Sequence, residues 1–193
     1  MNKYTFKMSS FIKKIVIISI FFFISFKAYA ACKFELELGD KVSKIEKKYG
    51  PPFPLEFVGD DQLGLIAADA DEVCPNHSLK DVALEYRFLN DELAAVNLIS
   101  LEPDSDTKKS KKTTIMNYVK RNYGNFDTGQ NPESYIGYKV FERTRQFVVY
   151  QRMDDGSGLI QEEMYISNNK YDQLLAEFFN KLEEDMAESE SQN

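Results

Sequence analysis

The chain has 193 residues and is acidic, with 31 Asp and Glu against 24 Lys and Arg and a formal net charge of −7. Residues 1–30 contain five lysines and no acid, so the remaining 163 residues carry a net charge of −12. Nucleic acids and anionic lipids bind clustered positive charge, so this balance argues against both as partners. The negative charge would attract a basic protein partner, and the commoner alternative is that it serves only solubility. The length is that of one ordinary domain.

The N-terminus has the pattern of an export signal. Four lysines precede an apolar run at residues 15–26, and the small residues Ala28 and Ala30 follow it. As a helix this run would reach only about 18 Å, less than the roughly 30 Å of a membrane's hydrocarbon core. We predict that residues 1–30 are a cleaved signal peptide, that no transmembrane segment remains, and that the mature protein is periplasmic or secreted.

Both cysteines, Cys32 and Cys74, follow this segment. In an oxidising compartment an even number predicts one disulfide, which would stabilise the fold by about 3–4 kcal/mol for a loop of roughly forty residues. The alternative is cleavage directly before Cys32 and lipidation of its sulfur. That alternative is less favoured, because Tyr29 replaces the branched aliphatic residue of a lipoprotein signal and Cys74 would keep an unpaired thiol.

The first elements of the mature chain are predicted to be short. Residues 34–38 alternate apolar and acidic side chains, which is typical of a short strand or an extended lead-in. Asp40 is expected to be the N-cap of a helix that runs to Tyr49, and Gly50 is expected to end that helix.

Strands are predicted next. Two short apolar pieces lie at residues 55–58 and 63–67. Alternating apolar residues at 82–88 and a second run at 93–101 flank Asn90-Asp91, which predicts a hairpin.

Residues 104–112 are polar throughout and predict a linker between two halves of the chain. The second half is expected to contain, in chain order, a helix at 115–123, one or two strands at 138–153, a strand at 159–166 and an amphipathic helix at 171–182. The acidic, Ser-containing tail at 187–193 is expected to be disordered.

The two halves share a local pattern. Lys47-Lys48-Tyr49-Gly50 and Arg121-Asn122-Tyr123-Gly124 both end a predicted helix, 74 residues apart. We predict a single α+β domain at residues 31–186, in which two helix-plus-antiparallel-meander units, 31–103 and 113–186, share a sheet closed by the C-terminal helix. Because identity between the halves is low, coincidence is the alternative.

The first unit resembles the small secreted α/β modules of the outer-membrane assembly lipoproteins (SmpA/OmlA-like) and the beta-lactamase inhibitor proteins. The resemblance covers only the first helix and its flanks, through Gly39, Val42, Ile45, Tyr49, Gly50 and Pro52. It implies a scaffold or inhibitor without catalytic residues. The tandem layout suits the inhibitor proteins better, and Tyr29 departs from the signal of the assembly lipoproteins.

Few residues suggest metal or nucleophile chemistry. His77, the one histidine, lies three residues after Cys74, but an oxidised Cys74 could not form a catalytic pair with it. One histidine and two cysteines are a poor zinc set. The acids Asp69, Asp71 and Glu72 lack the spacing of a calcium loop, so an acidic surface loop is expected. We assign no catalytic, cofactor or metal residue.

Two further sets of side chains are candidates for functional sites, one catalytic and one for binding a protein. Glu142, Glu162 and Glu163 are candidates for paired carboxylates in a hydrolase, with cross-strand ion pairs to Arg143, Arg145 and Arg152 as the alternative. A tyrosine set is the candidate interface, although core packing explains part of it: Tyr135, Tyr138, Tyr150 and Tyr165. The basic run at 108–112 is expected to be a solvated linker.

These observations lead to one functional hypothesis and one alternative. We expect an exported, non-catalytic protein that binds a protein partner of the cell envelope, as an accessory factor or as an enzyme inhibitor. The alternative is a periplasmic carrier of a lipid or small apolar ligand, which would need an apolar cavity of several hundred cubic ångströms.

Overall fold

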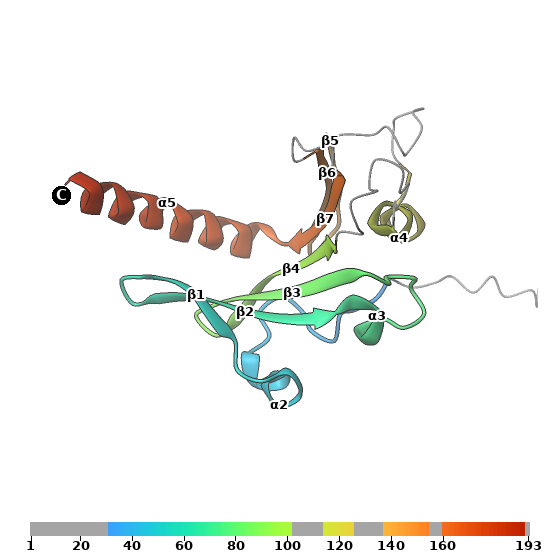
Figure 1. Cartoon of the computed structure of the whole chain (residues 1–193), viewed down its shortest axis with the longest axis horizontal. Coiled ribbons are helices and arrows are strands. Elements are labelled where there is room, and N and C mark those ends of the chain that lie inside the picture. The colour runs from blue at the N-terminus through green and yellow to red at the C-terminus, as the bar shows by residue number, and fades with distance from the viewer. Residues whose placement is uncertain (1–30, 102–113, 126–136, 155–159, 192–193) are drawn as a thin grey trace, which may run out of the picture. The chain divides into compact units, whose positions relative to one another are not determined.

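The computed structural model describes residues 31–101, 114–125, 137–154 and 160–191. These residues form an α+β fold around one seven-stranded antiparallel sheet, as expected (Figure 1). The predicted signal peptide at 1–30 and the predicted linker at 104–112 lie outside the described residues.

Each half of the chain contributes one meander to the sheet. The strand order is β1-β2-β3-β4-β7-β6-β5, so the last strands of the two halves, β4 and β7, pair at the junction. The strands are β1 (Phe53–Val58), β2 (Asp61–Asp69), β3 (Val82–Leu89), β4 (Glu92–Ser100), β5 (Gly137–Glu142), β6 (Phe147–Asp154) and β7 (Ile160–Ser167). The predicted stretch at 138–153 is therefore two strands.

The predicted hairpin is present. β3 and β4 pair through the turn at Asn90 and Asp91, whose φ angles of 50° and 68° are those of a two-residue turn in the left-handed region. The helices are η1 (Val42–Lys44, a 3-10 turn), α2 (Glu46–Tyr49), α3 (Ala70–Val73), α4 (Thr114–Tyr123) and α5 (Asn169–Ser191). The short helix α3 has no counterpart among the predictions.

The prediction of a helix capped by Asp40 is wrong. The helical residues are split between η1 and α2, and the Asp40 carboxylate accepts a hydrogen bond from the amide of Glu37 instead (2.8 Å). The reason is tertiary: the Gly39 amide donates to the Leu93 carbonyl and the Leu93 amide donates to the Asp40 carbonyl, both at 2.8 Å. This pairing with β4 keeps the backbone extended until η1. Gly50 ends α2 with a φ of 87°, as predicted.

The predicted short strand or extended lead-in at 34–38 is also wrong, although Phe34 and Leu36 are buried as the pattern indicates. Phe34 and Glu35 have φ angles of 51° and 61°, which break an extended chain. The Phe34 amide donates to the sulfur of Cys32 (3.2 Å), and its carbonyl accepts from the buried Tyr86 hydroxyl (2.8 Å). These long-range contacts hold the segment in turns.

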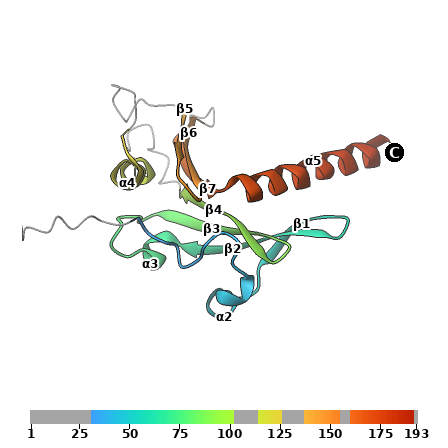
Figure 2. The same cartoon turned by 180° about the vertical axis from the view of Figure 1, so that it is seen from behind.

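The two faces of the sheet are covered by different elements. On one face the segment 34–45, α3 and α4 form the larger core with alternate residues of β2, β3, β4, β6 and β7. On the other face α5 packs over the β1–β4 half through Tyr171, Leu175 and Phe178. Figures 1 and 2 show α4 beside β5–β7 and α5 running away from these strands along the β1–β2 hairpin.

The helix α5 is longer than predicted. It continues to Ser191, so the expectation of a disordered tail at 187–193 is wrong for all but its last two residues, which lie outside the described part. Leu182 is the last residue of α5 that packs against the core, and residues 183–190 are all exposed. No helix in the described ranges is both long and apolar enough to cross a membrane.

Candidate functional site

The most strongly organised polar site lies between β7 and α4 and is centred on Glu162. Its side chain is 1 % exposed. The carboxylate accepts hydrogen bonds from the amides of Ile115 (3.3 Å) and Met116 (3.0 Å) and from the hydroxyl of Tyr150 (2.9 Å). Because Ile115 and Met116 belong to the first turn of α4, the carboxylate satisfies amides that have no partner within the helix.

The surroundings of Glu162 are those of a structural anchor. Burial raises the pKa of its carboxyl group, while the helix amides, Tyr150 and the charge of Arg152 act in the opposite direction. Arg152 is its register partner on β6 and is 2 % exposed. The Glu162 amide donates to the hydroxyl of Ser100 on β4 (2.9 Å). Through its carboxylate and its backbone amide, Glu162 thus connects α4 to its own strand β7 and to β6 and β4.

The three candidate carboxylates do not converge. Glu162 and Glu163 are adjacent in β7 and therefore project from opposite faces of the sheet. Glu163 accepts from the side-chain amides of Asn97 (3.1 Å) and Gln151 (2.6 Å), and Glu142 is exposed on β5. This arrangement does not place two carboxylates about a common substrate, as a glycosidase would require. Glu162 and Arg152 are register partners on neighbouring strands, which is the placement that the alternative of cross-strand ion pairs requires.

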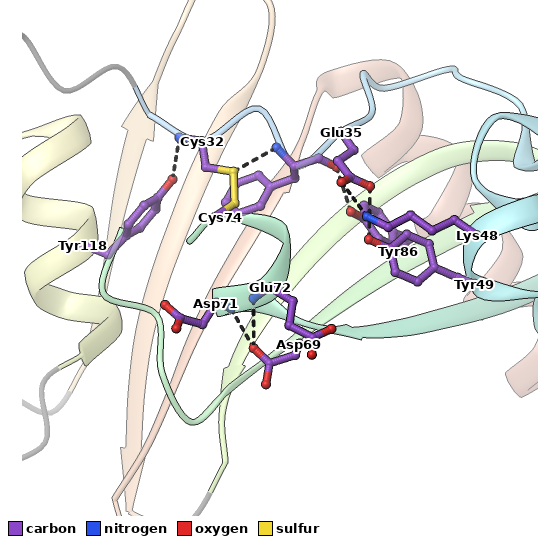
Figure 3. The surroundings of a disulfide bond; sticks show 11 residues. Cys32, Glu35, Lys48, Tyr49, Asp69, Asp71, Glu72, Cys74, Tyr86 and Tyr118 are labelled. Atoms are coloured by element: carbon purple, nitrogen blue, oxygen red, sulfur yellow. Dashed lines mark hydrogen bonds and ion pairs between the residues drawn. A yellow bond between two sulfur atoms is a disulfide. The ribbon is translucent and has the colours of Figure 1, made fainter. Parts of the chain in front are cut away.

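The predicted disulfide between Cys32 and Cys74 is present, with the two Cα atoms 6.0 Å apart (Figure 3). It joins the start of the described chain to the end of α3. The Cys32 amide donates to the Tyr118 hydroxyl (3.1 Å), which connects the same point to α4. The His77 ring packs edge-on against Tyr118, with ring centroids 5.8 Å apart. A catalytic pair between Cys74 and His77 is excluded while Cys74 is oxidised.

The acidic loop near α3 has a local structural role. Asp69 caps α3, and its carboxylate accepts from the amides of Asp71 (2.7 Å) and Glu72 (3.3 Å) (Figure 3). Within the described ranges, no group of three His, Cys, Asp or Glu side chains is placed to hold a metal ion.

The four tyrosines of the candidate interface do not share one environment. Tyr138 is 72 % exposed on β5, whereas Tyr150 is fully buried and cannot contact a partner. Tyr165 is half-buried and donates to the Asp172 carboxylate (3.0 Å); burial raises its pKa to about 12. Tyr135 and the basic run at 108–112 lie outside the described residues.

The β5–β7 half of the sheet has one covered and one exposed face. On β6, alternate residues Val148 and Tyr150 are fully buried against α4. On the opposite face, Tyr138 (72 % exposed), Val140 (44 %) and Met153 (41 %) reach solvent. Pairing of β5 with β6 puts these three side chains on one face, which we call the open face.

Two surface cavities adjoin this half. One of about 680 Å³ lies between the β5–β6 turn and the start of α5, and its walls include Phe147, Val149 and Lys170. The second, of about 490 Å³, extends toward the segment 31–38. Both are lined by Arg145, Gln146 and Asn168, but they open on opposite faces of the sheet, and we call the first cavity the Arg145 groove.

Sequence reasoning missed the organisation of the Glu162 site. The sequence does contain one indication of this site. Glu162 precedes Met164 and Ile166 at alternate positions of the strand, so it lies on the same inward face as these apolar residues. An acid at such a position needs a partner when buried, but the sequence does not say that the partner is the first turn of α4.

Comparison with known proteins returned no relative: no protein-family model, curated protein or solved structure matches the chain.

Proposed function

We propose that this protein is exported and acts by binding a protein partner on the open face, as an accessory factor of the cell envelope or as an inhibitor of an exported enzyme. The observation that carries the proposal is the exposure of Tyr138, Val140 and Met153 together on a sheet whose opposite face is a packed core. Aromatic and methionine side chains are enriched where proteins bind one another.

The environment of the polar groups supports binding over catalysis. The carboxylates Glu162 and Glu163 are engaged in hydrogen bonds that hold strands and α4 together. On the open face, Gln151 pairs in register with Tyr138 and its amide is held by Glu163. The polar groups beside the exposed apolar side chains are therefore fixed, which lowers the entropic cost of binding.

Export is supported by the pattern of residues 1–30 and by the disulfide. A bond between Cys32 and Cys74 is typical of oxidising compartments, and it occupies the sulfur that a lipid would modify. The intact mass of the protein purified from its own cells tests this point. We expect a mass that corresponds to a chain beginning at Ala31 with one disulfide. A mass that shows a diacylated Cys32 would refute the proposal that the protein has no lipid anchor.

Site-specific photo-cross-linking in the native cells tests the partner. A photoreactive amino acid at position 138 or 153 should give one dominant cross-linked protein. The matched position is Lys47, which is exposed on α2 and remote in sequence from the open face. Equal cross-linking at position 47, or none at 138 and 153, would contradict the proposed surface.

The second candidate function is the transport of a lipid or small apolar ligand, because the Arg145 groove has a volume in the range of ligand sites. Its walls include charged side chains such as Arg145 and Glu142, which an apolar ligand would have to desolvate. Native mass spectrometry of the purified protein separates the two. A bound lipid together with no cross-linked protein would favour the carrier.

A further inference from the structure

We infer that the Arg145 groove binds the C-terminal end of α5, residues 183–191, from a second copy of this chain, so that the protein assembles head to tail. The inference does not rest on the proposed partner. It starts from two surfaces of the described chain that are opposite in charge, that each include an apolar part, and that lie too far apart to meet within one molecule.

The first surface is the projecting end of α5. Beyond Leu182 this end extends about 13 Å at 1.5 Å per residue. It carries five exposed acids and no basic residue: Glu183, Glu184, Asp185, Glu188 and Glu190. Negative charge at the C-terminus of a helix is unfavourable because the peptide dipoles already make that end negative. A cationic partner would relieve this repulsion.

The same end presents an apolar side chain. Met186 is 55 % exposed and follows Leu182 by four residues, so it continues the stripe by which α5 packs on the sheet. Glu183 and Glu190 lie three residues before and four residues after Met186, and thus on its face of the helix. The projecting end is therefore an amphipathic acidic segment whose apolar side chain has nothing of its own molecule to cover it.

The second surface is the Arg145 groove, which is basic although the chain as a whole is acidic. Its walls hold one acid, Glu142, and three cations, Arg143, Arg145 and Lys170. Lys170 also forms an ion pair with Glu92 (3.6 Å), so Arg143 and Arg145 carry most of the positive charge. Arg143 also donates to the Glu142 carbonyl (2.7 Å), which fixes it at the rim. Phe147 and Val149 give the groove an apolar wall against which a methionine can pack.

The position of the groove excludes an intramolecular contact. Asn168, Asn169 and Lys170 line it, so the groove lies at the first turn of α5. The acidic segment occupies the last nine residues of the same 23-residue helix and begins about 20 Å along the helix axis from Lys170. A rigid helix cannot bring its own end to its own start. The end of one α5 must therefore meet the start of another, where opposite ends of the two helix dipoles face each other.

This contact joins two different surfaces, so the assembly grows head to tail unless it closes into a ring. A segment of nine helical residues buries less area than a standard protein interface, so we expect weak, micromolar association. Because charges supply much of the attraction, the association should weaken in high salt.

Sedimentation velocity of the purified, disulfide-bonded protein tests the inference. The average mass should rise with protein concentration in about 50 mM NaCl and return toward the monomer in about 500 mM NaCl. Arg145→Glu should abolish the rise by reversing the charge of the groove. Lys80→Glu makes an equal charge change at an exposed position outside the groove, and the average mass of this variant should still rise with protein concentration. Thermal unfolding of each variant verifies that it is folded.

The helix end offers its own matched pair of variants. Glu183→Lys/Glu190→Lys reverses the charge on the face of Met186 and should give a monomer. Glu184→Lys/Glu188→Lys makes the same charge change two residues to either side of Met186, on the opposite face of the helix, and should have a smaller effect.

A mixing experiment distinguishes head-to-tail assembly from any symmetric dimer. Arg145→Ala keeps an intact helix end and Glu183→Ala/Glu190→Ala keeps an intact groove, and neither variant carries a reversed charge that could attract the altered surface of the other. Each alone should be monomeric, and an equimolar mixture should form a dimer that does not grow. A monomeric wild type at all concentrations in low salt, a mixture that stays monomeric, or a symmetric dimer that Arg145→Glu leaves intact would overturn the inference.

Discussion

The two halves of the sheet differ in how many of their faces are covered. The β1–β4 half is covered on one face by the segment 34–45 and α3, and on the other by α5. In the β5–β7 half, α4 covers one face, while Tyr138 and Met153 remain exposed on the other. The last helix, α5, thus packs on the first half of the sheet. Because α5 does not cover the second half, the open face remains exposed to solvent.

The halves also differ in how their covering elements are attached. In the first half a covalent bond, Cys32–Cys74, joins the N-terminal segment to α3. In the second half, hydrogen bonds to the buried Glu162 connect α4 to the sheet. A disulfide acts mainly on the unfolded chain, whereas a buried carboxylate acts on the folded state and depends on pH. The comparison therefore makes different predictions for the two halves.

The largest expected effect is from Glu162→Ala. The change removes the acceptor for two α4 amides and for Tyr150, and it removes the negative charge that acts on the buried Arg152. We expect a loss of about 3–5 kcal/mol in the free energy of unfolding, measured with urea. Glu142→Ala, at an exposed position, should change it by less than about 0.5 kcal/mol. Equal effects of the two variants would show that Glu162 does not anchor α4.

Removal of the disulfide in a Cys32→Ser/Cys74→Ser variant should cost about 3–4 kcal/mol, because the unfolded chain gains the freedom of the loop between residues 32 and 74. The loss should be seen with the same urea titration. Hydrogen exchange should increase first in the segment 34–38, which the disulfide ties to α3. Faster exchange confined to α4 would contradict this assignment.

The pH dependence of the free energy of unfolding should distinguish the contribution of Glu162 from that of the disulfide. Burial raises the pKa of Glu162 in the folded protein above its unfolded value, which is near 4.3. The folded state then holds the proton more tightly, so the contribution of this group to stability falls as the pH rises from the unfolded to the folded pKa. The disulfide has no such dependence.

Glu162→Gln provides the comparison for this pH dependence, because it removes the titration and keeps a side chain of similar size. The urea midpoint of the wild type should fall relative to that of Glu162→Gln as the pH rises above the unfolded pKa of about 4.3. A wild type that gains stability relative to the variant over this range would show that the helix amides and Arg152 outweigh burial.

The smallest expected effect concerns how α5 is held on the first half. Lys181 on α5 forms an ion pair with Asp61 at the start of β2 (3.7 Å), and both side chains are substantially exposed. Lys181→Ala should therefore change the free energy of unfolding by less than about 0.5 kcal/mol. A larger loss would mean that the charge, rather than packing through Leu175 and Phe178, holds the helix in place.

Local patterns predicted many of the elements. The hairpin at Asn90-Asp91, the helix ended by Gly124 and the periodic start of α5 follow from residues within one or two turns of each other. The failures at Asp40 and at residues 34–38 have one cause. In both places the backbone bonds to residues distant in sequence, Leu93 and Tyr86, and these bonds override the local preference.

The candidate site was less predictable than the fold. Glu142, Glu162 and Glu163 look alike in the sequence, yet one is exposed, one is buried under a helix and one is held by neighbouring amides. The tyrosines divide in the same way, with Tyr138 exposed and Tyr150 buried. Which side of a strand faces the core depends on register, and register is a property of strand pairs.

The sequence by itself determined the acidic charge, the α+β class and the pairing of the two cysteines, because each depends on composition or short-range periodicity. Only the tertiary structure decided that α5 covers β1–β4 and leaves the open face free, and that Glu162 binds the first turn of α4. The physical reason is that burial and hydrogen bonding are settled between segments far apart in the chain. Their pairing depends on the whole sheet rather than on the residues of either segment.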